Sequence, residues 1–320
     1  MTSAVVALRN AVRPYLQLRE PGDVVLVAVS GGADSLALAY ALLKEAEAQA
    51  ITVIPVTIDH QLQVGSGEQA ERVHNQLVAM GYKKVIIKKV NVVQNAGIEA
   101  DARTARYLAL DEVLTENGAQ EIYLGHTRDD QAETVLLGLA RGSGTRSLSG
   151  MAPVNGKYIR PLLSLTREET VATCKELDLD FWNDPHNQSL EFSRVRVRNE
   201  ILPMMEEKLG PGISAALARS AALLRDDADA LDEMAQSAMA GLDLADLDCK
   251  TLEAMPKAVR TRILRSAIYA QGAPHGSISA DHIAGVEALV TSWHGQGVIS
   301  LPGGVKVSRM SGRLSLLARE

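Results

Sequence analysis

An apolar run that is followed by a serine and two glycines constrains this chain of 320 residues more than any other feature. Residues 24–29 are apolar without interruption, which is typical of a strand buried on both faces of a sheet. The sequence Ser30-Gly31-Gly32-Ala33-Asp34-Ser35 comes next, and an Ala/Leu-rich helix is expected over 36–48. Because glycine lets the backbone bend sharply and approach a ligand closely, the end of this strand is predicted to carry a binding turn.

The alternation of strands and helices continues through the first half of the chain. Strands are expected over 51–58, 85–90 and 122–124, with helices over 66–80 and 100–115. Strands separated by helices of this length form βαβ units. The predicted fold class is therefore α/β, with a doubly wound parallel sheet.

The pattern changes near residue 185, and we expect two domains, 1–205 and 206–320. The second is predicted to be mainly helical, with helices over 213–240, 251–270 and 280–291. Short alternating segments over 298–301, 305–310 and 314–317 then predict a closing β-meander.

Composition excludes several classes of protein. No stretch of eighteen apolar residues occurs, so no membrane partner is expected. Arg9, Arg13 and Arg19 interrupt the first twenty residues, which therefore do not resemble a signal peptide, and a cytoplasmic location is expected. The two cysteines, Cys174 and Cys249, support neither a disulfide framework nor a Cys-type zinc site.

Charge is distributed unevenly along the chain. The net charge of −6 argues weakly against a nucleic-acid partner. However, residues 226–248 carry eight acids and no base, whereas a basic run follows at Lys257, Arg260, Arg262 and Arg265. A local basic surface for RNA is thus compatible with an acidic total.

The turn after the first strand has the chemistry of a phosphate site. A helix N-terminus offers free N–H groups and positive partial charge, and Ser30 and Ser35 add hydroxyls. Asp34 would repel phosphate unless Mg²⁺ lies between them. The alternative is that Asp34 or Ser35 only caps the helix. Neither the Walker pattern nor G-x-G-x-x-G is present.

Two further groups of polar residues are candidates for ligand contacts, one at a strand end and one on a helix. Asp59 and His60 follow the second strand, where parallel sheets bind ligands, although a simple Asx turn explains them equally well. Arg103 and Arg106 share a helix face, either as a solvated face paired with Glu99 or as cations for phosphates.

The richest stretch is 124–134, which contains His126, Asp130 and Glu133. Asp130 and Glu133 are three residues apart before the Leu-rich helix expected over 134–140, so both carboxylates point the same way. Capping and dipole compensation are the simple explanation. The alternative is a site for Mg²⁺ or for the ammonium group of a cationic substrate. The following basic loop, 141–150, is either a surface linker or a cover for a nucleotide.

The hexapeptide at 30–35 resembles the S-G-G-x-D-S signature of PP-loop ATP pyrophosphatases. Residues 124–151 resemble the characteristic block of bacterial tRNA(Ile)-lysidine synthetases. The segments 99–107, 160–163, 183–185 and 194–203 match later motifs of that family in order. Gln61, Thr127 and Val195 depart from the usual family residues, which leaves the exact roles of their segments open.

The resemblance implies an enzyme that uses ATP and Mg²⁺ to join free L-lysine to the wobble cytidine of tRNA(Ile) with a CAU anticodon, through an adenylated cytidine. It implies catalytic roles for Asp34, Arg103, Arg106, Asp130 and Glu133. It implies ATP contacts by Ser30, Gly31, Gly32, Ala33, Asp34, Ser35, Asp59, His60 and His126, with Asp34 as the metal ligand. The positive charge and the position of the following residues make them the expected RNA contacts: Arg146, Arg194, Arg196, Arg198, Lys257, Arg260, Arg262 and Arg265.

Two rival functions are a PP-loop tRNA thiolase and a non-catalytic ATP sensor. A thiolase needs cysteines for a cluster or persulfide, and this chain has no C-x-x-C pair. A sensor has no use for the acidic cluster at 126–133. The sequence leaves the oligomeric state open, a homodimer included.

Overall fold

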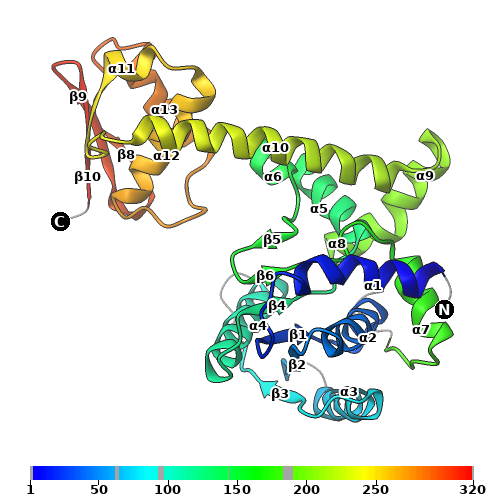
Figure 1. Cartoon of the computed structure of the whole chain (residues 1–320). Helices are drawn as coiled ribbons and strands as arrows, with labels where there is room; N and C mark the ends of the chain where they lie inside the picture. The colour runs from blue at the N-terminus through cyan, green and yellow to red at the C-terminus, as the bar shows by residue number, and fades with distance from the viewer. Residues whose placement is uncertain (1–2, 62–64, 93–96, 143, 183–189, 319–320) are drawn as a thin grey trace. The chain divides into compact units, whose positions relative to one another are not determined.

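The computed structural model describes residues 3–61, 65–92, 97–142, 144–182 and 190–318, with only the backbone at 98 and 99. It divides into two compact units, one formed by Met1–Gly142 with Gly150–Ala221 and the other by Ser143–Ser149 with Ala222–Glu320 (Figure 1). The change from one unit to the other falls inside α10 (Ile213–Met239). The boundary expected between 205 and 206, with a catalytic ATP-binding domain before it and a tRNA-binding domain after it, stays a prediction.

The first unit is built on a six-stranded sheet with the order β3-β2-β1-β4-β6-β5. All neighbouring pairs are parallel except β5 with β6, so the expected doubly wound parallel sheet is confirmed. The strands are β1 (Val24–Ala28), β2 (Thr52–Asp59), β3 (Ile86–Lys89), β4 (Glu121–Tyr123), β5 (Val154–Asn155) and β6 (Tyr158–Ile159). The β5–β6 hairpin was not expected, because strands of two residues carry no periodicity.

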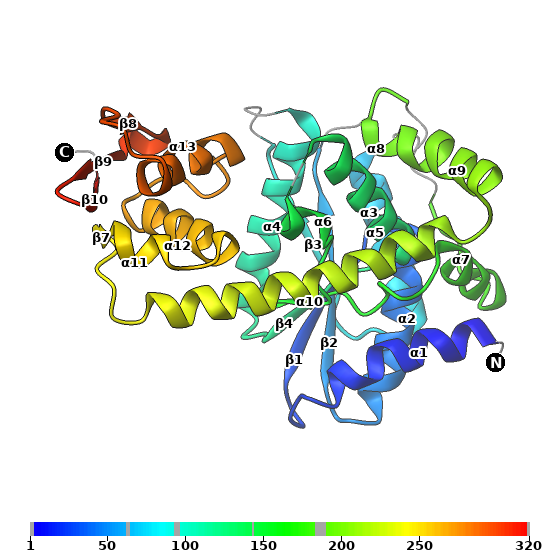
Figure 2. The same cartoon turned by 90° about the horizontal axis from the view of Figure 1, so that it is seen from above.

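Helices cover both faces of this sheet (Figure 2). One face packs with α1 (Ser3–Leu16), α2 (Ala33–Glu47), α3 (Ser66–Met80) and α7 (Arg167–Glu176). The other face packs with α4 (Ile98–Glu116). Alternate β1 residues face the two layers, Val25 and Val27 toward α2 and Leu26 toward α4. Burial on both faces explains why β1 is apolar throughout.

A small helical cluster completes the first unit. It contains α5 (Arg128–Ala140), α8 (Ser193–Arg196), the π-helical turn η2 (Val197–Ile201) and α9 (Leu202–Leu209). Ala132, Val197 and Leu202 form its buried centre. Helix α5 begins six residues before the expected 134, which places Asp130 and Glu133 inside its first two turns.

The second unit contains α6 (Thr145–Leu148), α11 (Cys249–Glu253), α12 (Lys257–Ala270), α13 (Ala280–Thr291) and η3 (Pro302–Gly304). Its antiparallel sheet has the order β7-β10-β9-β8, formed by β7 (Asp246–Asp248), β8 (Ile299–Ser300), β9 (Lys306–Met310) and β10 (Arg313–Leu317). The predicted meander is confirmed, and β7 extends it. The single helix expected over 251–270 is wrong, because Pro256 disfavours helical geometry before it and separates α11 from α12.

Within the described part of the chain, no helix combines the length and apolar character needed to cross a membrane.

Candidate active site

The turn between β1 and α2 has a backbone that only glycine adopts easily. Gly31 has φ +87°, and a Cβ there would lie 2.6 Å from Cγ2 of Val73. The backbone N–H of Ser30 donates to Oγ of Ser35 at 3.2 Å, which closes the turn over the start of α2. The turn is thus fixed from both sides, and the N-terminus of α2 lies at its end.

Asp34 lies on the first turn of α2 and is held by α7. Its Oδ2 accepts a hydrogen bond from Nε of Arg167 at 3.3 Å, and its Oδ1 accepts one from the hydroxyl of Thr170. Burial raises the pKa of Asp34, and the charge of Arg167 and the Thr170 hydrogen bond counter this effect. The carboxylate is therefore oriented by protein donors at both oxygens.

Gly125 allows the first turn of α5 to approach Asp34. A Cβ at Gly125 would lie 3.1 Å from the carbonyl oxygen of Asp34. Thr127 immediately precedes α5, and its N–H and hydroxyl donate to Oδ2 of Asp130 at 2.8 and 3.0 Å. The capping considered from the sequence is therefore present at Asp130, whose other oxygen faces three arginines.

Three guanidinium groups surround Asp130 and Glu133. Glu133, whose side chain is fully buried, accepts hydrogen bonds from Nε of Arg194 at 2.7 Å and from Nε of Arg198 at 2.6 Å. Oδ1 of Asp130 lies 3.2 to 3.4 Å from nitrogens of Arg167, Arg194 and Arg198. Arg194 and Arg198 lie on α8 and η2, four residues apart, so consecutive turns aim both at the same carboxylate.

The arginines determine the protonation state of Asp130. Burial alone would raise its pKa, but the charges of Arg167 and Arg194 outweigh burial and hold the pKa below its ordinary value. The same carboxylates raise the pKa of Arg167 despite burial. Asp130 is consequently an anion near neutral pH.

Two histidines predicted to contact ATP have a buried ring nitrogen without a partner. Nδ1 of His60 and Nδ1 of His126 are buried and make no hydrogen bond among the described residues. Burial, followed by the charges of Arg160 and Arg106, lowers the pKa of His126 to about 3. Burial and Arg106 also lower the pKa of His60. Both rings are therefore neutral near pH 7 and keep hydrogen-bonding capacity for a ligand.

Arg103 and Arg106 lie on the same side of α4, over the ring of Tyr107. Nη2 of Arg103 also donates to the Tyr107 hydroxyl at 3.1 Å. Burial, then the charges of Arg103 and Arg194, lower the pKa of Arg106. This region accumulates positive charge, which an anionic group would relieve. The side chain of Glu99, the ion-pair partner considered for Arg103, lies outside the described residues.

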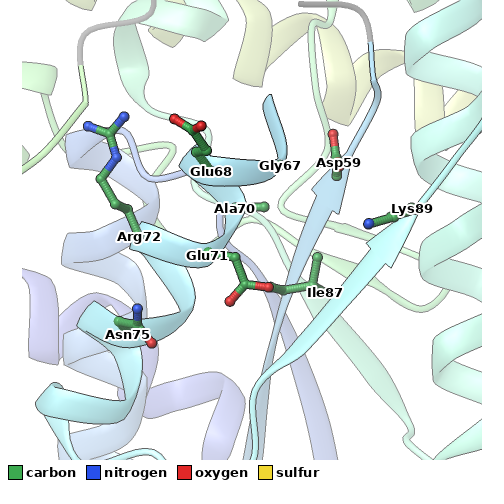
Figure 3. A pocket seen from close by; sticks show the side chains of 9 residues that line it. All are labelled: Asp59, Gly67, Glu68, Ala70, Glu71, Arg72, Asn75, Ile87 and Lys89. Atoms are coloured by element: carbon green, nitrogen blue, oxygen red, sulfur yellow. The ribbon is translucent and has the colours of Figure 1, made fainter. Parts of the chain in front are cut away.

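A pocket opens beside the end of β2 (Figure 3). Asp59 lies at its edge, with Lys89 on β3 and Gly67, Glu68 and Glu71 on α3. Oδ1 of Asp59 accepts a hydrogen bond from the N–H of Gln61 at 3.0 Å, so the Asx turn considered from the sequence is present. The pocket adjoins the carboxyl end of the sheet, where doubly wound folds bind nucleotides.

A metal fits this site only together with other ligands. The described residues contain no group of three or more His, Cys, Asp or Glu side chains that could hold an ion. Mg²⁺ needs fewer, because one or two carboxylates, phosphates and water complete its octahedron. Asp34 is compatible with that arrangement.

The residues predicted to contact RNA are mostly engaged within the protein. Besides Arg194 and Arg198 at Glu133, Arg196 donates to the carbonyls of Leu190 and Glu191. Arg260 is buried and pairs with Glu287 at 2.6 Å, which argues against a direct RNA contact.

In the second unit, Arg146 pairs with Asp229 and Asp232, and Asp232 also pairs with Arg262. Arg265 donates to a backbone carbonyl. Lys257 keeps 75% of its side chain exposed beside Glu287, so it is the best placed of these cations to meet a phosphate.

Sequence reasoning missed three residues that shape the site: Gly125, Arg167 and Thr170. Arg167 had a local signal, since a basic residue in the first turn of a helix opposes the helix dipole. The acids that pair with it come from α2 and α5.

Comparisons with known proteins identify the fold and the family of this chain. The family profile described as the PP-loop domain matches residues 6–205, and the one described as the TilS substrate binding domain matches residues 247–315. A U34-tRNA thiolase from Methanococcus maripaludis has the same fold, with a TM-score of 0.58 at 20% identity, over 69% of this chain and 80% of that one.

Curated relatives share much more of the sequence. A tRNA(Ile)-lysidine synthase from Streptomyces coelicolor is 51% identical over 92% of this chain and 87% of its own length. One from Thermobifida fusca is 46% identical over 98% of each chain. The chain therefore belongs to the tRNA(Ile)-lysidine synthase family, with a PP-loop domain as its ATP-binding half.

Proposed function

We propose that this chain joins free L-lysine to the wobble cytidine of tRNA(Ile) with a CAU anticodon. Membership of the family makes it an ATP-dependent, tRNA-modifying ligase. The observation that supports the finer assignment is the convergence of Asp34, Asp130 and Glu133 beside the turn at 30–35. A phosphate-binding turn and acceptors for a cationic amine are thereby joined in one site.

ATP is proposed to bind with its phosphates on the turn at 30–35 and its nucleoside toward the pocket beside Asp59. The unpartnered nitrogens of His60 and His126 fit a polar ligand in this region. Arg106 would offset the charge of the phosphate under attack. Mg²⁺ would be held by Asp34 and phosphate oxygens, and it would supply positive charge to the triphosphate.

The reaction requires two displacements. In the first, O2 of the cytidine bonds to the α-phosphorus of ATP and pyrophosphate leaves. In the second, an amine of lysine bonds to C2 of the base, AMP leaves with the oxygen, and the amine loses a proton. The low pKa of Asp130 makes it a weak base, so it suits binding of the ammonium group better than removal of its proton.

The carboxylates proposed to bind lysine are already neutralised by arginines within the protein. Three guanidinium groups offset the three carboxylates, and Glu133 is already occupied by Arg194 and Arg198. An ammonium group therefore gains most when one of these arginines turns toward a phosphate of ATP or tRNA. The RNA contacts predicted for Arg194 and Arg198 are proposed to belong to that second state.

The second unit is proposed to hold the tRNA, in keeping with the substrate-binding profile over 247–315. Lys257 would contribute a phosphate contact from its exposed position. A homodimer stays a prediction.

The test is pyrophosphate release and incorporation of radiolabelled lysine, with ATP, lysine and tRNA omitted one at a time. A tRNA with a different anticodon serves as the matched control. Lysine incorporation that needs all three components and the CAU anticodon would support the proposal. Sulfur transfer to the tRNA, or ATP binding without pyrophosphate release, would refute it in favour of the thiolase or the sensor.

A further inference from the structure

Arg167 differs from the other two arginines of the site by reaching all three carboxylates. Its Nε lies 3.3 Å from Oδ2 of Asp34, its Nη2 lies 3.2 Å from Oδ1 of Asp130, and its Nη1 lies 3.7 Å from Oε1 of Glu133. Among the described residues, no other Lys, Arg or His forms an ion pair with Asp34. One planar group thus spans the turn after β1 and the start of α5.

The backbone around Arg167 is fixed independently of its side chain. Helix α7 begins with a capping box between Thr166 and Glu169, with hydrogen bonds of 2.7 to 3.1 Å. The N–H of Arg167 donates to Oδ2 of Asp129 at 2.8 Å. The start of α7 is therefore joined directly to the start of α5.

Thr170 completes the contact one turn later. Its hydroxyl donates to Oδ1 of Asp34, while Arg167 occupies Oδ2. Thr170 is fully buried, so this hydroxyl meets no competing water from outside. The first turn of α7 consequently holds Asp34 by one charged and one neutral donor.

The electrostatics explain why a cation is needed at this point. Asp130 raises the pKa of Asp34, so the two carboxylates are close enough to repel each other, and the side chain of Asp34 keeps only 22% of its surface exposed. Like charges in a poorly solvated site repel strongly. Among the described residues, Arg194 and Arg198 form ion pairs with Asp130 and Glu133, whereas Arg167 forms ion pairs with both of these and with Asp34.

We propose that Arg167 is a positioning residue that fixes the distance between the ATP half of the site, at Asp34, and the amine half, at Asp130 and Glu133. The inference rests on the proposed function for the names of the two halves. Its geometric content is independent of them: α7, which supplies no reacting group, sets the spacing of carboxylates from two other helices. Arg167 touches neither ATP nor lysine in this role.

The test compares Arg167→Gln and Arg167→Lys with Lys175→Gln, which removes a charge from an exposed position on the same helix. Pyrophosphate release without lysine reports the first displacement, and lysine incorporation reports the second. Arg167→Gln should lower kcat for both on the order of 10²-fold, the usual effect of a misplaced reacting group. Arg167→Lys should restore part of the loss, and Lys175→Gln should match the wild type.

The pH profile separates positioning from a merely structural role. Without the Arg167 charge, Asp130 should lose its ionised form at higher pH, so the acid limb of the rate profile should move upward in Arg167→Gln. Thr170→Val removes a neutral donor from Asp34 and should reduce kcat without moving that limb. A loss of thermal stability with unchanged kcat and an unmoved limb would overturn the proposal.

A double-mutant cycle keeps the inference testable if the wild type incorporates no lysine. That result would refute the proposed function but would not affect the geometric part of the inference. Thermal unfolding of Arg167→Gln, Asp34→Asn and the double variant should then show that the two effects are not additive. Additive effects would overturn the positioning role.

Discussion

The Glu133→Gln substitution tests the centre of the site most directly. Glutamine keeps the size of the side chain and one carbonyl oxygen, but its amide places N–H donors against a guanidinium donor. The side chain is fully buried, with Nε of Arg198 at 2.6 Å from one oxygen and Nε of Arg194 at 2.7 Å from the other. One of these two contacts must therefore be lost.

The magnitude follows from the burial of the partners. A hydrogen bond to a charged group contributes about 1.5–3 kcal/mol, and removing one partner of a buried ion pair costs about 3–5 kcal/mol. Arg194 and Arg198 keep 28% and 26% of their side chains exposed, so a released guanidinium group can reach water. The lower part of the range applies, and we expect a loss of about 2 kcal/mol. For a unit of this size that corresponds to a fall in Tm of roughly 4–8 °C.

The assay is thermal unfolding followed by circular dichroism, together with lysine incorporation. Glu200→Gln is the control, because Glu200 is exposed on η2 and carries the same charge. Glu133→Gln should also lose most lysine incorporation, since the amine of lysine loses one anionic acceptor. If Glu133→Gln unfolds at the same temperature as Glu200→Gln, the ion pairs do not stabilise the fold and the reasoning fails.

Four further outcomes are expected. Gly31→Ala should lower ATP affinity in calorimetry, because the new Cβ meets Val73 and φ +87° strains any other residue; unchanged affinity would contradict a phosphate-binding turn. The free energy of unfolding should fall as the pH falls from about 6.5 toward 3, because His126 takes up a proton in the unfolded chain at a higher pH than in the folded one. Urea titrations at pH 7.5 and 5 should show a smaller fall in this free energy for His126→Gln than for the wild type. Lys257→Gln should reduce the salt dependence of tRNA binding by about one unit of slope, and an unchanged slope would remove Lys257 from the interface. Chelation of Mg²⁺ should stop pyrophosphate release and leave Tm unchanged, whereas a large fall in Tm would indicate a structural ion.

Much of the fold was predictable because its signals are local. The apolar run at β1, the glycines at 31 and 32 and the polar start of α5 act through neighbouring residues and short-range sterics. These features predicted the parallel sheet, the turn and the grouping of Asp130 with Glu133. Local signals were weak where elements are short, so β5, β6 and β7 were missed.

Charged residues were harder to interpret, because their partners are distant in sequence. A basic segment such as 194–198 indicates phosphate contacts when it is considered alone, yet Arg194 pairs with Glu133, 61 residues earlier. Arg260 likewise lies in a basic run but is buried against Glu287.

The sequence by itself determined the succession of strands and helices along the chain, the turn after β1 and the family resemblance. Only the tertiary structure decided which charges meet. Arg167 and Asp34 are 133 residues apart in the sequence but form a hydrogen bond, and no periodicity encodes such a contact. Periodicity reports which face of an element is buried, whereas the pairing of charges depends on how the buried faces bring separate elements together.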